Sequence, residues 1–334
     1  MRLGVLDIGS NTVHLLLVDA HPGARPVPFA SHKRPLSLVQ YLEPDGSISD
    51  EGQHELTEFV LEAWEFAARH KADDLLAFCT SAIREATNGA AVLARVKHET
   101  TVTLQELTGS EEASMTFFAV RRWHGWGAGP ILNLDIGGGS FEMAFGQDEL
   151  PEMATSVPLG ASRLTRDWLS EDPPSARSVK ELRRYIRATL KPAVSSFDGL
   201  GRANVVAGTS KTFRSLARIA GAAPSASGPY IKRELQAFDL GVWAQRISAM
   251  KAEDRLHLPG VSEARAHQLL AGALVAEAAL ELFKFKKVRI CPWALREGLI
   301  LRRLDQLVFA GPLEPAPHVA AAAGRIAAEA PAGA

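Results

Sequence analysis

Hydrophobic and polar positions follow one pattern that occurs twice in the chain. The first copy, residues 3–18, is an apolar run, Asp7-Ile-Gly, a small polar turn and a second apolar run. The second copy, residues 131–145, places Asp135-Ile-Gly in the same setting. Each copy predicts a β-hairpin whose turn carries one carboxylate, exposed backbone N–H groups and a glycine free to take a positive φ. Two copies predict two similar domains that face a shared cleft, each with a phosphate-binding turn.

The rest of the chain alternates between short apolar runs and helical spacing, which favours an α/β fold with its site at the strand ends. Further strands are predicted at 31–42, 75–79, 102–107, 204–207 and 287–291. Helices are predicted from Asp50, over 108–123, over 175–190, after 208–211, over 241–250, over 261–282 and after 292–298 to about 308.

Glycine and proline are dense at 125–130, so the domain boundary is predicted there. The predicted parts are therefore an N-terminal domain over 1–124, a C-terminal domain over 125–310 and a tail over 311–334. The tail is rich in Ala, Pro and Gly and is predicted to be disordered.

Composition narrows the partners and the compartment. The formal net charge is −1, so an anionic partner would need a local basic patch, and we expect no nucleic-acid partner. The two cysteines lie in apolar runs without paired spacing, which is typical of buried thiols in a reducing compartment. Asp7 interrupts the first apolar run, which argues against a signal peptide, and the apolar stretch 271–283 contains two glutamates and is too short to span a membrane. We expect a cytoplasmic protein without a membrane partner.

The two hairpin aspartates are candidate metal ligands. A single Asp-Gly turn is usually structural, but Asp7 and Asp135 both follow apolar strands, where an unpaired carboxylate is costly unless a cation meets it. Mg²⁺, or Mn²⁺ in its place, would satisfy both, and neighbouring backbone amides would cradle phosphate. Thr209 and Lys211 either start a helix or face an anion at a strand terminus. The predicted phosphate-binding residues are Gly9, Ser10, Asn11, Thr12, Gly137, Gly138, Gly139, Ser140, Gly208, Thr209, Ser210 and Lys211.

Six short motifs occur in an order and spacing that resemble the exopolyphosphatase and guanosine pentaphosphate phosphohydrolase (Ppx/GppA) family. They are 7–11, 81–86, 109–113, 135–142, 208–211 and 295–298. The resemblance covers the chain to about residue 308 and implies two actin-like (ribonuclease H-like) domains, each a mixed sheet flanked by helices, with an interdomain cleft. The chain has no His-Asp dipeptide, a signature of the longer members, and resembles the short two-domain form.

The resemblance also implies roles for individual residues. Glu112 matches the general base that orients the attacking water, and Asp135 and Glu142 match acidic residues of the metal and water network. Arg84 matches an arginine that grips phosphate. By the residues alone, Glu112 could equally be a helix-start acid, and Arg84 could be a surface residue.

A basic helix adds a candidate track for a long polyanion. Five cations recur there at three- and four-residue steps, and Glu181 is the one acid opposing them. They are Arg177, Lys180, Arg184, Arg187 and Lys191. A charged stretch is usually a solvated face, but this one would suit polyphosphate, and Arg121, Arg122 and the cluster 284–289 could extend it.

The resemblance departs from the family at two places and implies one leading function. Residues 265–267 are Arg-Ala-His where the family more usually has Arg-Ala-Asp, and 292–294 are Pro-Trp-Ala where it has Asp-Gly-Ala.

The implied function is a Mg²⁺-dependent exopolyphosphatase, a hydrolase that releases orthophosphate from inorganic polyphosphate. Hydrolysis of guanosine pentaphosphate stays open, as does a non-catalytic alarmone sensor, against which Glu112 argues. Either would link the chain to the stringent response, with guanosine tetra- or pentaphosphate as substrate or inhibitor. Whether it forms a homodimer stays open too.

Overall fold

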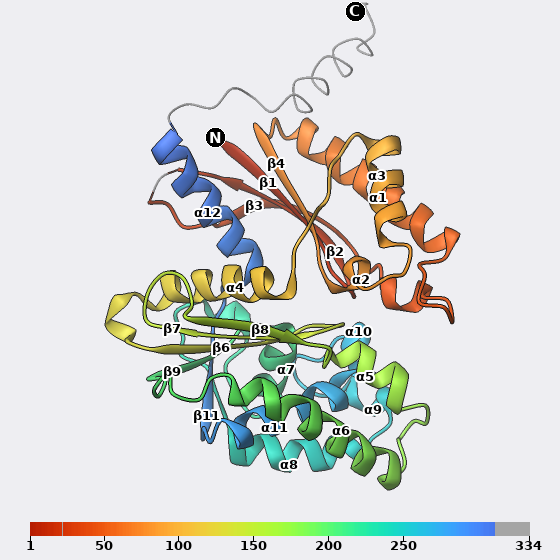
Figure 1. Cartoon of the computed structure of the whole chain (residues 1–334), viewed down its shortest axis with the longest axis vertical. Coiled ribbons are helices and arrows are strands. Elements are labelled where there is room, and N and C mark those ends of the chain that lie inside the picture. Colours follow the sequence, from red (N-terminus) through yellow and green to blue (C-terminus); the bar gives the residue numbers. More distant parts are fainter. Residues whose placement is uncertain (22, 311–334) are drawn as a thin grey trace, which may run out of the picture. The chain divides into compact units, whose positions relative to one another are not determined.

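The chain forms two compact units in a computed structural model that describes residues 1–21 and 23–310, without the side chains of 308–310 (Figure 1). Of the described residues, the first unit contains those within 1–108 and 299–310, and the second contains 109–298. Each unit has its own mixed β-sheet. The predicted tail, 311–334, lies outside the described residues.

The first unit is built on a five-stranded sheet in the order β3-β2-β1-β4-β5. The strands β1, β2 and β3 are antiparallel neighbours, and β4 and β5 add in parallel. Their bounds are β1 Arg2–Ile8, β2 Val13–Asp19, β3 Pro28–Arg34, β4 Asp74–Cys79 and β5 Gln105–Glu106.

Helices cover the first sheet because its central strands are apolar on both faces. Residues 3–6 of β1 are all buried. Apolar residues of α1 and α3 share one core with β1 and β2. Arg303 of α12 donates from Nε and Nη2 to Oδ2 of Asp74 at the start of β4, at 2.9 and 2.7 Å. The helices are η1 Leu38–Tyr41, α1 Asp50–Arg69, α2 Ser81–Arg84, α3 Gly89–Thr100 and α12 Leu295–Ala310, which begins in the second unit.

The second unit is built on a six-stranded sheet in the order β10-β11-β9-β6-β7-β8. The strands β6, β7 and β8 are antiparallel, β9 and β11 add in parallel, and β10 closes the edge in the antiparallel sense. Their bounds are β6 Ile131–Ile136, β7 Phe141–Gly146, β8 Met153–Val157, β9 Val205–Gly208, β10 Glu234–Gln236 and β11 Lys287–Ile290.

Two separate apolar clusters cover the two faces of the second sheet. On one face, alternate residues of β6 and β7 pack with α5, α6, α7, α8 and α11. On the other, Ile131, Ala144 and Ala207 pack with Ala113 and Phe117 of α4. The helices are α4 Gly109–His124, η2 Trp126–Ala128, α5 Ala161–Trp168, α6 Ala176–Ser195, α7 Lys211–Ile219, η3 Ser225–Ser227, α8 Ala237–Ser248, α9 Ala252–Arg255, α10 Glu263–Ala266 and α11 Leu269–Leu282.

The two sheets repeat one arrangement, which confirms the predicted duplication. In each, a hairpin extended by a third antiparallel strand (β1-β2-β3 and β6-β7-β8) is followed by parallel strands on its other side. The hairpins differ in what faces the aspartate across the ladder. Asp7 is paired in register with His14, and Asp135 with Glu142. The second hairpin therefore carries a second carboxylate.

Several predicted elements differ from the structure. The strand expected over 102–107 is reduced to Gln105–Glu106, and the strand expected over 31–42 is instead Pro28–Arg34 followed by η1. The helix expected over 261–282 is divided into α10 and α11. The units divide after Thr108 rather than at 125–130, because α4 packs on β7 and β8 and so belongs with the second sheet.

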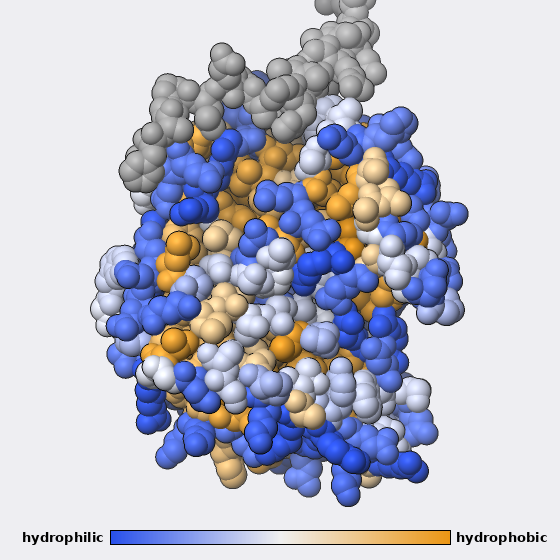
Figure 2. All heavy atoms as spheres, in the orientation of Figure 1, coloured by the Kyte–Doolittle hydropathy of each residue, from blue (hydrophilic) through white to orange (hydrophobic). Residues whose placement is uncertain are grey.

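Among residues 1–21 and 23–310, no helix is both long enough and apolar enough to cross a membrane. Figure 2 shows hydrophilic residues over much of the visible face, with hydrophobic residues in separate patches between them.

Candidate active site

The first hairpin turn is tied to the end of the neighbouring strand. The N–H of Gly9 donates to the carbonyl of Thr12 at 3.1 Å, which closes the turn. The hydroxyls of Ser10 and Ser81 are hydrogen bonded at 2.9 Å, and the N–H of Thr80 donates to the carbonyl of Ile8 at 3.2 Å. The predicted motifs at 7–11 and 81–86 therefore meet within the first unit.

The second hairpin turn has the same closure and is held in addition by α5. The N–H of Gly137 donates to the carbonyl of Ser140 at 2.9 Å. The carbonyl of Gly139 accepts from the N–H of Gly160 at 3.2 Å and from Nε of Arg163 at 2.8 Å, and the N–H groups that begin α5 donate to the carbonyls of the two preceding glycines. With its carbonyls bonded toward α5, the turn is fixed in position.

The turn glycines are needed for space rather than for φ. None of residues 9 or 137–139 has a positive φ, so that part of the prediction is wrong. A Cβ on Gly9 would lie 3.2 Å from the Thr12 carbonyl oxygen, and one on Gly137 would lie 3.3 Å from the Ser140 carbonyl oxygen. A Cβ on Gly160, which precedes α5, would lie 2.2 Å from the carbonyl carbon of Gly139.

Two carboxylates of the second unit are held by hydroxyl donors. The Thr209 hydroxyl donates to Oδ2 of Asp135 at 2.7 Å, and the Ser156 hydroxyl donates to Oε1 of Glu142 at 2.8 Å. Glu142 is 2% exposed and Thr209 is 1% exposed, whereas Asp135 is half-buried. Because Asp135 and Glu142 are register partners on β6 and β7, their side chains lie on the same face of the sheet.

Helix α4 covers this same face, and its direction brings Glu112 toward the two carboxylates. Near its C-terminus, Nη2 of Arg121 donates to the carbonyl of Gly146 at 3.1 Å, at the far end of β7. From Arg121 back to Glu112 the helix rises ~13 Å, and from Gly146 back to Glu142 the strand spans ~13 Å. Glu112 therefore lies at the level of Glu142, and it is half-buried while its neighbour Glu111 is exposed.

Arg84 is engaged within the first unit. Its Nη1 donates to the carbonyl of Leu107 at 2.6 Å, and its side chain is 16% exposed. This bond fixes the strand end that leads into the motif at 109–113. A role in gripping phosphate stays a prediction.

The loop 208–211 connects β9 to α7 beside Asp135. Ser210 caps α7 by accepting from the N–H of Phe213 at 3.3 Å, and the Thr212 hydroxyl donates to the carbonyl of Ile136 at 3.0 Å. Arg265 lies within electrostatic range: burial lowers the pKa of its guanidinium, while the charge of Asp135 raises it and that of Arg214 lowers it. The structure thus brings together Asp135, Thr209 and Arg265 in the second unit.

The predicted basic track on α6 is partly neutralised. Arg187 forms a bidentate ion pair with Glu281 of α11, and Arg177 bonds Glu181 at 3.0 Å. Glu181 is therefore not the one acid that opposes the track. The part of the extension at 121–122 is lost, since Arg121 is buried against backbone carbonyls and Arg122 pairs with Glu149 at 2.5 Å. In the cluster 284–289, Lys287 and Arg289 pair with Glu234 at 3.1 and 3.9 Å.

The donor set suits a hard divalent cation in kind. Mg²⁺ is usually held by one or two carboxylates and substrate phosphates, and it keeps several waters. Asp135 and Glu142 supply such oxygens in the second unit and Asp7 in the first. No cluster of three or more acidic, His or Cys side chains that could cage a metal occurs in the described part of the chain.

Several contributing residues were not predicted from sequence. Ser156 and Gly160 act through partners distant in sequence and carry no local motif. Arg265 could have been found from sequence, because the triplet 265–267 that contains it departs from the family pattern. The predicted residues Asp7, Gly9–Thr12 and Arg84 belong to the first unit, and all the others to the second.

Comparisons with known proteins agree with this architecture. The model of the Ppx/GppA phosphatase family matches residues 17–307. The chain is 53% identical over 306 residues to Exopolyphosphatase 1 of Mycobacterium tuberculosis, covering 91% of this chain and 89% of that protein. An exopolyphosphatase structure from Cytophaga hutchinsonii has a TM-score of 0.82 at 24% identity, covering 92% of this chain and 98% of that one. A Ppx/GppA family member from Aquifex aeolicus has a TM-score of 0.76 at 24% identity, covering 94% and 99%. This chain, with its duplicated carboxylate hairpins, belongs to the Ppx/GppA phosphatase family.

Proposed function

We propose that this protein is an exopolyphosphatase that hydrolyses the terminal phosphoanhydride bond of inorganic polyphosphate and releases orthophosphate. The observation that carries the proposal is the half-buried Glu112 at the level of the buried Glu142, on the face that also holds Asp135. The 53% identity to a mycobacterial exopolyphosphatase supports the same reaction.

Different residues of the second unit would bind the phosphate, activate the water and hold the carboxylates in place. The turn presents the backbone N–H groups of residues 138–140 to the terminal phosphate, because the N–H of Gly137 closes the turn onto Ser140. Glu112 accepts a hydrogen bond from water, orients it and takes its proton as it attacks phosphorus. Thr209 and Ser156 hold Asp135 and Glu142 in one orientation each, so that these carboxylates do not have to reorganise during the reaction.

A divalent cation, Mg²⁺ or Mn²⁺, would be held by Asp135 with Asp7 as the corresponding candidate in the first unit. When bound it would neutralise charge on the phosphate oxygens. We expect a cytoplasmic protein, because both cysteines are free thiols, which is usual in a reducing compartment.

The deciding experiment measures phosphate release from long polyphosphate, short polyphosphate and guanosine pentaphosphate at equal concentrations of chain ends. Polyphosphate should be the preferred substrate; faster release from guanosine pentaphosphate would assign the alternative activity. Glu112→Gln should lower kcat roughly 10²–10⁴-fold, because the amide cannot accept the proton of water. Glu111→Gln is the matched control, an exposed acid in the same helical turn, and should keep wild-type activity. Full activity in Glu112→Gln would remove Glu112 as the base.

A further inference from the structure

A cationic cavity of about 580 Å³ lies in the second unit beside the loop 208–211. Its walls come from α7, the segment 222–233, the segment 260–265 and the end of β11. Five cations line it and no acidic side chain does: Lys211, Arg214, Arg218, Arg233 and Arg265. We call it the arginine pocket. Like charges gathered around one cavity favour an anion there.

The arginine pocket offers hydrogen-bond donors rather than acceptors. Arg233 donates to the carbonyls of Ala223, Pro224 and Gly228 at 2.6–2.9 Å, and Arg218 donates to the carbonyl of Ala222 at 3.1 Å. These wall carbonyls are therefore occupied. The lining includes no carboxylate, carboxamide or aromatic side chain, and apart from three serines its polar side chains are all cations.

One donor in the pocket is buried without a protein partner. Nη2 of Arg214 donates to the carbonyl of Pro292 at 3.0 Å, whereas Nε of Arg214 is buried and has no hydrogen-bond partner among the described residues. A buried donor left unsatisfied costs on the order of 1–3 kcal/mol. An anion, which accepts strongly and neutralises charge, would remove that cost.

The arginine pocket adjoins the residues proposed to hold the terminal phosphate. Lys211 lines the pocket and is two residues from Thr209, whose hydroxyl bonds Asp135. Arg265 also lines it and interacts electrostatically with Asp135. The pocket therefore lies next to the candidate active site: the loop 208–211 takes part in both, and Arg265 of the pocket interacts with Asp135 of the site.

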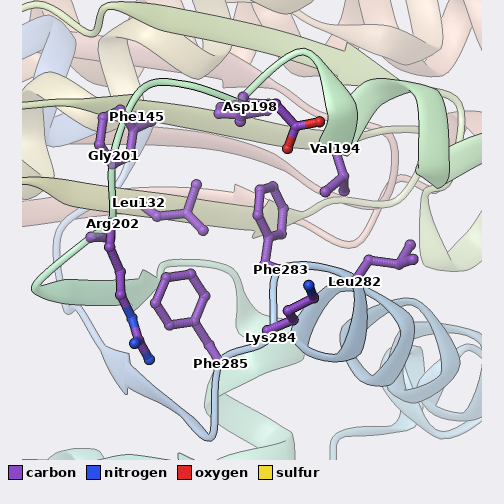
Figure 3. A pocket seen from close by; sticks show the side chains of 12 residues that line it. Leu132, Phe145, Val194, Asp198, Gly201, Arg202, Leu282, Phe283, Lys284 and Phe285 are labelled. Carbon is purple, nitrogen blue, oxygen red and sulfur yellow. The ribbon is translucent and has the colours of Figure 1, made fainter.

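The alternative sites suit a polyanion less well. The C-terminal end of α6, near Lys191, lies close to where β6 and β9 begin, which is the end of these strands opposite the Asp135 turn. There, Val194 of α6 lines a cavity of about 370 Å³ with Leu132, Phe283 and Phe285 (Figure 3). Figure 3 shows aromatic and aliphatic side chains around that cavity, with two cations, Arg202 and Lys284, and the carboxylate of Asp198, whereas the arginine pocket has five cations and no carboxylate.

We propose that the arginine pocket binds the internal phosphate groups of a polyphosphate chain whose terminal phosphate lies at the Asp135 and Thr209 turn. The inference rests on the proposed function and deepens it by naming the residues that favour long chains. Successive phosphates each carry negative charge and acceptor oxygens, which match an array of guanidinium donors.

Two kinds of variant test the pocket. Ser225→Glu adds a negative charge at an exposed position of the lining and removes no described hydrogen bond, so the fold should be preserved. Arg218→Gln removes one cation of the wall, and Arg218→Lys restores its charge. The comparison variants are Ala188→Glu and Arg184→Gln on the exposed face of α6, the earlier candidate track; they make the same changes in charge away from the pocket and so test the two sites against each other.

The readouts are KM and kcat for tripolyphosphate and for long polyphosphate at two salt concentrations, and equilibrium binding of long polyphosphate in chelator. Ser225→Glu and Arg218→Gln should raise KM for the long chain about 10-fold and weaken binding equally, with kcat and the KM for tripolyphosphate unchanged. Arg218→Gln should flatten the salt slope by roughly 0.7, the single-strand value for one phosphate contact. Arg218→Lys should recover most of the affinity, and the α6 variants should behave as wild type.

Other outcomes would overturn the inference. Equal effects on short and long chains, or equal effects of the α6 variants, would mean that the pocket does not select chain length. Weaker binding of guanosine pentaphosphate with unchanged polyphosphate binding would assign the pocket to a nucleotide. Wild-type protein that releases no phosphate from any polyphosphate would refute the proposed function, whereas the binding measurement would still judge the pocket.

Discussion

Replacing Gly160 by alanine tests whether the position of the second hairpin turn limits the reaction. Gly160 has φ −72° and ψ 146°, a conformation that alanine adopts freely, so the substitution introduces no backbone strain. The added Cβ would instead lie 2.2 Å from the carbonyl carbon of Gly139 and 2.3 Å from the carbonyl oxygen of Gly138. Both are backbone atoms, so no side chain can move aside.

The size of the effect follows from these distances. Ordinary contact begins at 3.4 Å, so the turn and the start of α5 must separate by about 1.2 Å. A misplacement of about 1 Å at a reacting centre can cost ~10²-fold in rate. Overpacking of this kind costs about 1–3 kcal/mol of stability, which a domain of this size can tolerate. Gly160→Ala should therefore fold and lose about two orders of magnitude in kcat.

The assay compares kcat on polyphosphate with the melting temperature of the same preparation. Gly241→Ala is the control, because its Cβ meets one atom at an ordinary 3.6 Å, and α8 should gain up to ~1 kcal/mol from the better helix former. A folded Gly160→Ala protein with wild-type kcat would refute the reasoning, since the turn could then be displaced without consequence.

Three further predictions concern the acidic groups and pH. Ser156→Ala should lower stability by about 1.5–3 kcal/mol, measured by denaturant unfolding, because buried Glu142 loses a charged hydrogen bond; unchanged stability would contradict this contact. Asp135→Asn, and Asp7→Asn by the same reasoning, should raise the Mg²⁺ concentration needed for half-maximal rate, and superimposable Mg²⁺ titrations would exclude both as ligands. Burial lowers the pKa of His124 from 6.5 to about 4, so between these pH values the unfolded chain binds more protons than the folded one. The free energy of unfolding therefore falls as pH drops through this window. His124→Gln should reduce that pH dependence, measured by unfolding at pH 7 and pH 5.

Local patterns allowed much of the fold to be predicted. Both hairpins follow from an apolar run, an Asp-Ile-Gly turn and a second apolar run, all within about fifteen residues. The helix over 108–123 likewise has its apolar residues at local spacing. These elements depend on neighbours in sequence, and their bounds agree with the structure to within a residue or two.

The site was less predictable, because its fixing contacts join distant segments. The hydroxyl of Thr209 reaches Asp135 across 74 positions, and Gly160 matters because it touches a turn some twenty residues earlier. The charge balance of α6 failed for the same reason: Glu281, which pairs with Arg187, lies 94 residues away on α11. Nothing in the composition of either segment indicates these pairings.

The return of α12 to the first unit bears on the order in which the molecule can be assembled during synthesis. Residues 1–108 leave the ribosome before the segment that contains Arg303. The hydrogen bond between Arg303 and Asp74 can therefore form only after the second unit has been synthesised. The second unit is contiguous, and its last residue, Gly298, packs against the carbonyl of Met115 near its start. It can therefore close upon itself while the first remains incomplete. The unit that begins the chain is expected to be the last to reach its final form.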